Sequence, residues 1–260
     1  MKPDEKPGMT PDVKPDMKLG MRPAPPRAKR ARVLFGATIA LLLYGAYLAL
    51  TWPDVARLAH ENPRSTAFID RYREKQHDAR VSGGVAWTWV PYDRISPELK
   101  RAVLVAEDIN FFHHNGFDRG EIRVALREAW DDRELPRGAS TLTQQTAKNL
   151  WLSARWDPVR KIREALLTRA LEHRLGKRRI FEIYLNVAEF GPGVYGAEAA
   201  AQHYFGVPAA ALDTDQSAQL AAGLPRPSTW HPGCTTRAYQ RRVHSVLARM
   251  AKADLRGVPL

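Results

Sequence analysis

Two adjacent carboxylates, Glu107 and Asp108, end an apolar segment that begins at Ile95 and has the pattern of a helix. Aromatic residues, two histidines and a turn-forming Asn-Gly pair follow. A carboxylate at the edge of a core is partly desolvated, which raises its pKa toward the useful range for a general base. If the helix continued, Glu107, Phe111 and His114 would share one face. The alternative is a last helical turn with core phenylalanines and solvated acids.

A second group of polar residues lies between residues 138 and 149. Thr141 and Gln144 have the spacing of a capping box, which predicts the start of a helix. On that helix Thr141, Gln145 and Lys148 stand at i, i+4 and i+7, so they share one face. Capping alone explains Thr141 and Gln144. It does not explain Gln145 or Lys148.

A third group, Arg160, Lys161 and Glu164, lies on a long helix predicted to start at Asp157-Pro158 and to end near Gly176 as its C′ residue. Arg160 and Glu164 alone could form an i,i+4 ion pair, worth about 0.2–0.5 kcal/mol. The apolar stripe expected on this helix comprises Val159, Ile162, Leu166, Ala170 and Leu171.

With a fourth run, Lys177 to Asn186, these stretches resemble glycosyltransferase family 51, the peptidoglycan glycosyltransferases, and within it the monofunctional biosynthetic transglycosylases. The family motifs read E-D-x-x-F-x-x-H-x-G, G-x-S-T-x-x-Q-Q-x-x-K-N, R-K-x-x-E and K-x-x-I-L-E-x-Y-L-N. All four occur in this order, and the one departure is Phe181 where the family has Leu. The resemblance extends from about Val81 to the C-terminus, and the short tail after residues 224–227 leads us to expect no transpeptidase domain.

The resemblance implies a mainly α-helical, lysozyme-like domain with two lobes and a cleft, in which lipid II is polymerised into glycan strands. It implies that Glu107 is the base for the acceptor hydroxyl and that Glu164 is a second acid near the donor pyrophosphate. A divalent cation, Mg²⁺ or Mn²⁺, could bind there, and no organic cofactor is expected. The implied substrate-binding residues are Asp108, Phe111, His114, Ser140, Thr141, Gln145, Lys148, Asn149, Arg160 and Lys161. His114 could instead be a core or capping histidine.

The chemistry of the leaving group favours this function over hydrolysis. A lipid pyrophosphate leaves as a stable anion, so the reaction needs one basic carboxylate and a set of cations. A glycoside hydrolase needs two carboxylates, one of them protonated. Lys148, Arg160 and Lys161 fit the first demand. The alternatives are a membrane-anchored lytic enzyme of lysozyme type and a non-enzymatic envelope scaffold.

The N-terminal part divides by composition. Residues 1–32 hold seven prolines and a net charge of +5, which is typical of disorder. Residues 33–52 carry no charge and follow a basic flank, which predicts a single transmembrane helix with a cytoplasmic N-terminus. A cleaved signal peptide and a buried core helix are the alternatives. Residues 53–80 form a membrane-proximal helical linker, and residues 81–260 the periplasmic catalytic domain at the inner membrane.

Composition limits the partners and cofactors. The net charge of +12 suits an acidic partner such as an anionic lipid or a phosphorylated substrate. Nucleic acid is not expected, because the domain is predicted to face away from the cytoplasm. Lipid II, the glycan strand and the membrane are expected partners, with cell-division or transpeptidase proteins as further candidates. The single cysteine, Cys234, permits no internal disulfide, and no metal-ligand spacing occurs in the sequence.

Overall fold

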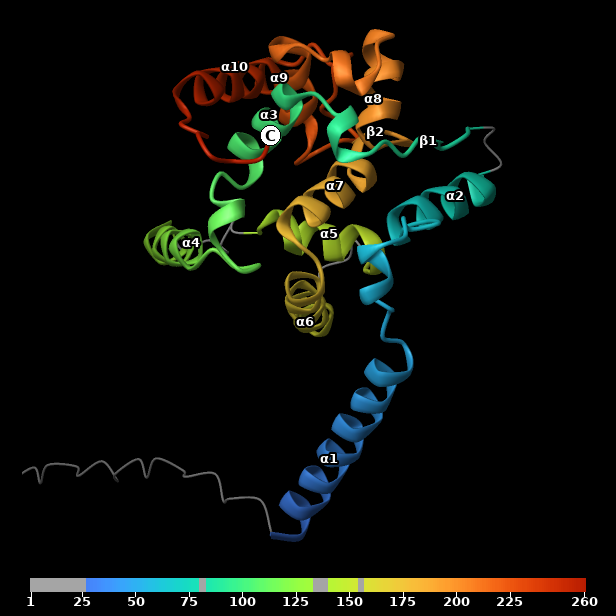
Figure 1. The fold of residues 1–260 in the computed structure, drawn as a ribbon. Helices are drawn as coiled ribbons and strands as arrows, with labels where there is room; N and C mark the ends of the chain where they lie inside the picture. Colours follow the sequence, from blue (N-terminus) through green and yellow to red (C-terminus); the bar gives the residue numbers. More distant parts are fainter. Residues whose placement is uncertain (1–26, 80–82, 133–139, 154–156) are drawn as a thin grey trace, which may run out of the picture. The chain divides into compact units, whose positions relative to one another are not determined.

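The computed structural model describes residues 27–79, 83–132, 140–153 and 157–260, and the chain divides into two units after Trp52. The described part is mainly helical, as predicted, with only short strands (Figure 1). Of the tail predicted to be disordered, residues 1–26 lie outside the described part, as does most of the exposed connection predicted at residues 131–137.

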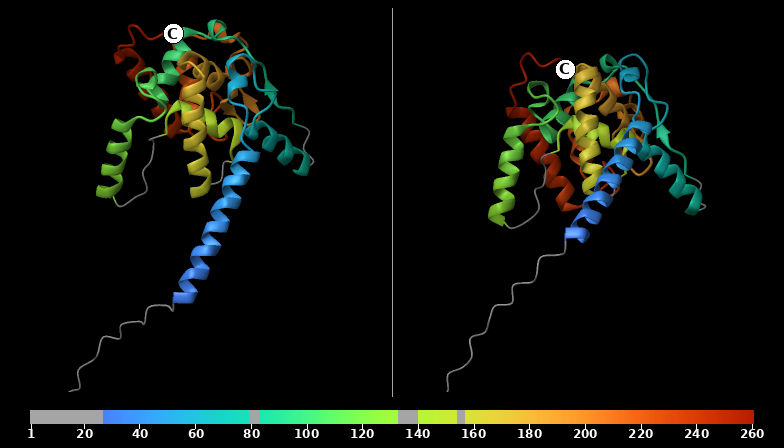
Figure 2. Two further views of the ribbon diagram at one scale, coloured as in Figure 1. Left: turned by 60° about the horizontal axis from the view of Figure 1, so that its bottom comes forward. Right: turned by 90° about the horizontal axis from the view of Figure 1, so that it is seen from below.

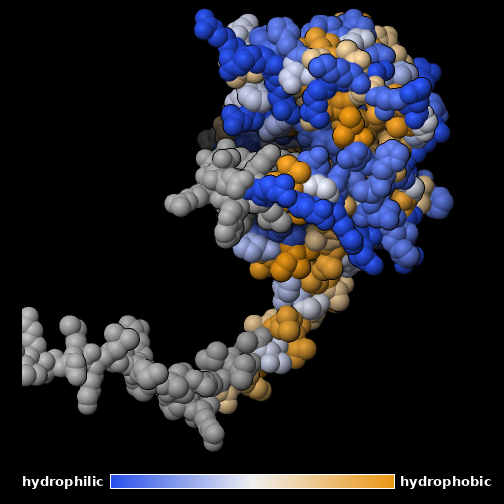
Figure 3. Space-filling view, turned by 90° about the vertical axis from the view of Figure 1, so that its left-hand side faces the viewer, coloured by the Kyte–Doolittle hydropathy of each residue, from blue (hydrophilic) through white to orange (hydrophobic). Residues whose placement is uncertain are grey.

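The first unit contains one described helix, α1 (Arg27–Leu50). Its large apolar side chains are exposed, including Phe35 at 69% and Leu41 at 71%, and Figure 3 draws much of this helix in orange. Among the described residues, no helix combines the length and the apolar character that a membrane crossing requires. The transmembrane helix predicted at residues 33–52 is therefore not confirmed.

The second unit, Pro53–Leu260, contains the motif residues. The predicted helical linker at residues 53–80 has only a short 3₁₀ turn, η1, and the helix α2. The helices of this unit are η1 (Ala56–Ala59), α2 (Ala67–Ala79), η2 (Tyr92–Arg94), α3 (Pro97–Glu107), η3 (Phe111–His113), α4 (Arg119–Asp132), α5 (Leu142–Trp151), α6 (Pro158–Arg174), α7 (Lys177–Val187), α8 (Ala197–Phe205), η4 (Ala209–Ala211), α9 (Thr214–Gly223) and α10 (Arg237–Lys252).

Helix α3 carries the first motif and is fixed at both ends. The Ser96 hydroxyl caps it by accepting the Glu98 N–H, and Pro97 occupies the first position, as the sequence predicts. The helix ends at Glu107, because Asp108 has φ −165°. A single face shared by Glu107, Phe111 and His114 is therefore not formed, since Phe111 starts a separate 3₁₀ turn.

The capping box predicted for the second motif is present. Thr141 accepts the backbone N–H of Gln144, and the Gln144 side chain accepts the backbone N–H of Thr141. The Thr141 hydroxyl also donates to the Gly116 carbonyl at 2.7 Å. The start of α5 is therefore joined to the loop that follows the first motif.

Helix α6 corrects two predictions. Gly176 has φ −72° and caps α7 instead of closing α6 in a left-handed turn. Only part of the predicted apolar stripe faces the core. Leu171 is fully buried and Ala170 packs against the core, but Val159 is 47%, Ile162 57% and Leu166 43% exposed. The buried residues of α6 are Glu164, Leu167, Thr168 and Leu171. The buried face of α6 therefore contains the charged Glu164 beside apolar residues.

Two groups of helices surround the site residues. Helices α3, α9 and α10 pack together, and α5 contacts both α6 and α7 (Figures 1 and 2). The predicted core residues Ile180, Ile183, Tyr184 and Leu185 of α7 are all buried. A small sheet in the order β1-β3-β2, from β1 (Ala86–Trp87), β2 (Glu189–Gly191) and β3 (Val194–Tyr195), lies beside α8. Residues 83–91 alternate and contain strand-forming residues, which predicts a strand, but within this segment only Ala86–Trp87 forms one, as β1.

Candidate active site

Glu107 lies at the last residue of α3 with both carboxylate oxygens engaged. Gln145 donates its side-chain N–H to Glu107 Oε2 at 3.0 Å. Arg242 of α10 donates to Glu107 Oε1 at 3.2 Å. Only 11% of the Glu107 side chain is exposed. Three helices that are distant in the sequence therefore meet at this carboxylate.

Burial raises the pKa of Glu107, as the sequence predicts for a carboxylate at the edge of a core. The hydrogen bond from Gln145 and the charges of Arg242 and Lys148 act in the opposite direction. The result is a carboxylate that is a stronger base than an exposed glutamate but still has cations beside it. That combination suits proton abstraction near neutral pH.

Gln145 is itself held in one orientation. The Tyr184 hydroxyl of α7 donates to Gln145 Oε1 at 3.2 Å. The amide oxygen therefore faces Tyr184 and the amide nitrogen faces Glu107. Because Tyr184 is fully buried in the core, this chain of hydrogen bonds fixes Glu107 relative to the packed interior.

Two hollows open on either side of this group. Glu107 lines the smaller one, about 210 Å³, with Ser140, Thr141 and Arg249 on its walls. Gln145 lines the larger one, about 550 Å³, whose other polar residues include Lys148, Asn149, Tyr184, Glu189 and Arg226. Polar groups thus continue from the carboxylate into a second, more cationic space.

Lys148 is surrounded by the charges of the other motifs. Burial lowers the pKa of its ammonium group, while Glu164 and Glu107 raise it and Arg160 and Lys161 lower it. The structure therefore brings the second and third motifs to the same place as Glu107. The Phe68 ring of α2 lies 5.9 Å from Lys148 Nζ.

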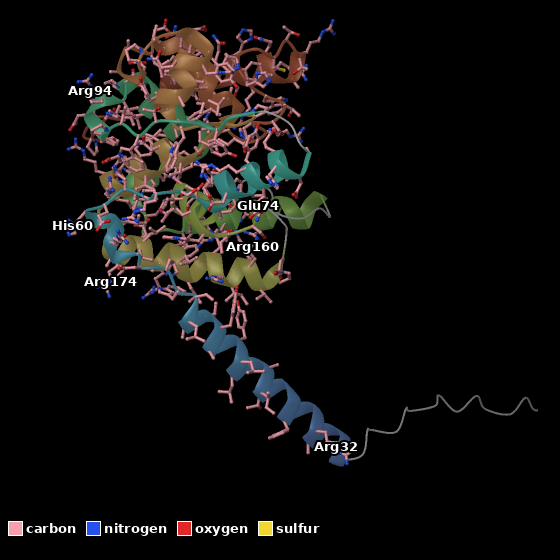
Figure 4. The ribbon with its side chains drawn as sticks, turned by 90° about the vertical axis from the view of Figure 1, so that its right-hand side faces the viewer. Arg32, His60, Glu74, Arg94, Arg160 and Arg174 are labelled. Atoms are coloured by element: carbon pink, nitrogen blue, oxygen red, sulfur yellow. The ribbon has the colours of Figure 1, made fainter. Side chains whose placement is uncertain are left out.

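Glu164 is buried, with 3% of its side chain exposed, and forms ion pairs with Arg160 at 2.7 Å and with Lys161. Figure 4 labels Arg160 in the first turn of α6. A buried carboxylate with two cationic partners is more than the surface i,i+4 pair that the sequence alone allows. Arg160, Lys161 and Glu164 together carry one excess positive charge, which is available to an anionic ligand.

Asp108 and His114 join the first motif to α5. His114 Nε2 lies 3.0 Å from Asp108 Oδ1, and the backbone N–H of Leu142 donates to Asp108 Oδ2 at 2.9 Å. Phe111 is fully buried, with the Lys177 ammonium 4.4 Å from its ring centre. These side chains hold the loop between α3 and α5, and Phe111 lines neither hollow.

Ser140, Asn149 and Lys161 are placed differently. Ser140 is exposed at the edge of the smaller hollow, and Asn149 is largely buried beside the larger one. The Lys161 side chain is 48% exposed, although it pairs with Glu164.

Several polar residues that line the site are not among the predicted site residues, including Arg242, Tyr184, Arg226 and Glu189. Tyr184 was assigned to the core, where it does lie, but its hydroxyl reaches Gln145. Arg242 is one of several arginines on an amphipathic helix, 135 residues after Glu107. Nothing in its local sequence distinguishes it, because its contact depends on how α10 packs.

The carboxylate expected near a donor-bound cation, Glu164, is paired with basic side chains in this structure. Both Glu164 oxygens are bonded to cations of its own helix. Among the described residues, no group of three or more His, Cys, Asp or Glu side chains could hold a metal ion. Magnesium in phosphoryl-transfer sites is usually held by one or two carboxylates together with the substrate phosphates.

Comparison with known proteins gives consistent similarities. The family described as Transglycosylase matches residues 74–251. The chain is 47% identical over 215 residues to the biosynthetic peptidoglycan transglycosylase of Alcanivorax borkumensis, covering 82% of this chain and 85% of that protein. It is 43% identical over 233 residues to the protein of the same name from Bordetella avium, covering 85% and 94%. The corresponding Laribacter hongkongensis protein is 40% identical over 218 residues, covering 84% and 96%.

Proposed function

Because this chain belongs to the transglycosylase family and is a peptidoglycan glycosyltransferase, we propose that it polymerises lipid II with Glu107 as the base. The observation that carries the assignment of roles is the pair of contacts to Glu107 from Gln145 and Arg242. They hold a buried carboxylate at the wall of a hollow, where an acceptor hydroxyl can reach it. Removal of the hydroxyl proton by such a base is worth about 10²–10⁴ in rate.

The donor is bound through its pyrophosphate by the cations of the second and third motifs. Lys148 lines the larger hollow, and Arg160 and Lys161 lie close enough to act on its charge. As the bond to the sugar breaks, negative charge grows on the pyrophosphate oxygens, and these cations stabilise it. The acceptor hydroxyl attacks from the face opposite the leaving group, so the sugar configuration inverts.

Hydrolysis would require a second, protonated carboxylate at the cleaved bond. The acids that share the smaller hollow with Glu107 include Asp108 and Asp118. Asp108 is bonded to His114 and to the Leu142 N–H. The hydrogen bond from Asn110 lowers the pKa of Asp118. The surroundings of Asp118 therefore favour its charged form and not a protonated acid, which favours transfer over lysis.

The helical body with a site between packed helices supports a lysozyme-like domain with two lobes around a cleft. The charge-free run at residues 33–52, after a basic flank, supports a single-pass inner-membrane protein with the catalytic domain in the periplasm. The exposed Val159, Ile162 and Leu166 of α6 give the catalytic unit an apolar face for a lipid surface. Cell-division or transpeptidase proteins are the expected protein partners.

The orientation is tested with reporter fusions at the C-terminus. We expect an active alkaline phosphatase fusion and an inactive cytoplasmic reporter, with the protein in the membrane fraction after a salt wash. The opposite pattern of reporter activity would show that the catalytic unit is cytoplasmic.

Polymerisation is tested with the purified full-length protein and labelled lipid II, with the products separated on a gel. We expect a ladder of glycan strands, and no ladder from a Glu107→Gln control. Unchanged lipid II with the parent protein would argue for a scaffold. Shortening of preformed glycan strands would argue for the lytic alternative.

A further inference from the structure

Glu107 receives one hydrogen bond from inside the motif set and one from outside it. Gln145 belongs to the second motif, but Arg242 lies in α10, close to the end of the chain. The two donors bind different oxygens of the same carboxylate. Together they restrict rotation of the carboxylate plane at the wall of the smaller hollow.

Arg242 is placed by the packing of α10 and not by a flexible surface contact. Thr236 caps the helix, and α10 packs on both α9 and α3. Val243 and Val246, one and four residues further on, are buried in this contact. The Arg242 side chain is 31% exposed, and its Nε is buried with no hydrogen-bond partner among the described residues. An arginine gives up hydration in this way only where its charge is used.

We propose that Arg242 is a positioning residue for glycosyl transfer, holding Glu107 ionised and oriented toward the acceptor hydroxyl. This role rests on the proposed function of Glu107 as the base. It deepens that function by assigning to the C-terminal helix a direct part in setting the working pH range of the enzyme.

The other groups around Glu107 define what Arg242 adds. From α5, Gln145 donates a hydrogen bond and Lys148 contributes a positive charge. From α7, the Tyr184 hydroxyl interacts with the Glu107 charge. Arg249 of α10, with Asp108, Asp118 and Glu121, lines the same hollow. Arg242 is the cation that touches the carboxylate itself. Loss of Arg242 removes a positive charge that stabilises the buried Glu107 carboxylate, so the protonated form of Glu107 gains stability.

The test compares Arg242→Gln and Arg242→Lys with Arg241→Gln. Arg241 is the adjacent, exposed residue of α10, so its replacement removes the same charge from the same helix without touching Glu107.

The acid limb of the pH profile of kcat reports protonation of the base. For Arg242→Gln we expect this limb to move up by about half a unit to one unit, with the KM for lipid II near that of the parent. Arg242→Lys should shift it less, because the charge is kept but the fork geometry is lost. Arg241→Gln should match the parent.

A profile of Arg242→Gln that superimposes on the parent profile would overturn the proposal, as would an equal shift in Arg241→Gln. A titration that does not depend on turnover separates this result from the proposed function. The carboxylate infrared band of Glu107, isolated by subtracting the spectrum of Glu107→Gln, should titrate at higher pH in Arg242→Gln than in the parent. If the parent makes no polymer but the band still shifts, the proposed function fails and the electrostatic contact stands. If thermal unfolding shows that Arg242→Gln is not folded, the decision rests on the Glu107 band in Arg242→Lys. A band in that variant that titrates as in the parent would overturn the proposal.

Discussion

At the residue scale, the site depends on carboxylates and cations that compensate one another. Burial raises the pKa of Glu107, and its hydrogen bonds and neighbouring cations act in the opposite direction and favour the charged form. Burial also lowers the pKa of Lys148, while Glu164 and Glu107 raise it. The charged form of each of these groups is therefore stabilised by the others. Substitution of one group at a time should show what each contributes.

Replacement of Glu107 and of Lys148 should affect different steps. Glu107→Gln removes the base, so polymer formation should fall by about 10²–10⁴. Binding of a phosphoglycolipid donor mimic should persist, because loss of a negative charge does not weaken attraction for a phosphate. Lys148→Ala removes a cation, so both binding and rate should fall. Calorimetric binding beside the gel assay measures both, with Arg160→Ala expected to resemble Lys148→Ala and Glu164→Gln to lie between the two classes.

An equal loss of donor binding in Glu107→Gln and Lys148→Ala would contradict this division of roles. Near-parent polymerisation by Glu107→Gln would remove Glu107 from the chemistry.

At the scale of elements, the site is built on helix ends. Glu107 closes α3, Thr141 caps α5, and the Asp108 carboxylate accepts the first free N–H of α5. Helix ends expose backbone N–H and C=O groups that need partners. Here polar motif residues supply those partners, so the same residues determine the positions of the helices and of the catalytic groups.

The cap of α5 can be tested apart from substrate binding. Thr141→Val keeps the shape of the side chain but removes the hydroxyl that caps α5 and donates to Gly116. We expect a loss of about 1–2 kcal/mol in the free energy of unfolding. Thr141→Ser, which keeps the hydroxyl, should unfold at nearly the parent denaturant concentration. If Thr141→Val lowers activity with no change in unfolding, the hydroxyl serves the substrate and not the cap.

Gly116 is required by backbone conformation in the same loop. Its φ is +86°, and an added Cβ would lie 2.8 Å from Cγ2 of Thr168 in α6. Gly116→Ala should therefore destabilise the fold by at least about 1–2 kcal/mol, measured by chemical unfolding. Gly84→Ala is the matched control, because no heavy atom lies within 4 Å of its added Cβ. Equal stability of the two variants would show that the loop relaxes without cost.

At the scale of the whole molecule, one half-buried acid, Glu189, lines two hollows on the surface. Glu189 of β2 lines the 550 Å³ hollow beside Lys148 and also a hollow of about 490 Å³ along α2. Burial raises its pKa to about 7, and the charge of Lys75 lowers it only in part. An ionised Glu189 is thus less stable in the folded protein than in the unfolded chain.

This predicts a pH dependence of stability. The folded pKa of Glu189 is about 7 and its unfolded value 4.5, so the folded state binds the proton more tightly. Its contribution is fully present below pH 4.5 and is lost as the pH rises through about 7. Glu189→Gln, which stays neutral, should exceed the parent by about 1–2 kcal/mol at pH 8, given its partial exposure, and should equal it near pH 4.

The measurement is urea unfolding at both pH values, with the exposed Glu74→Gln of α2 as the control (Figure 4 labels Glu74). A Glu189→Gln advantage that is the same at pH 4 and pH 8 would assign it to packing and not to ionisation.

Features that depend on neighbours in the chain were predictable from the sequence. The Thr141–Gln144 capping box and the helix start at Asp157-Pro158 follow local rules of spacing and residue type, and both are present. The motif pattern was also sufficient to identify the family, because catalytic groups of a shared mechanism recur at fixed spacing. The roles of Glu107 and Lys148 could be proposed for the same reason.

Only the tertiary structure decided which faces are buried and which distant groups meet. Of the stripe predicted on α6, Leu171 is buried and Ala170 is partly buried, but Val159, Ile162 and Leu166 are exposed and the paired Glu164 is buried. A prediction from hydrophobic residues alone omits the stabilisation that two adjacent cations give a buried carboxylate. The Arg242 contact with Glu107 arises because α10 packs on α3 across 135 residues of sequence. Such a contact has no local signature, since it depends on helix packing and not on spacing.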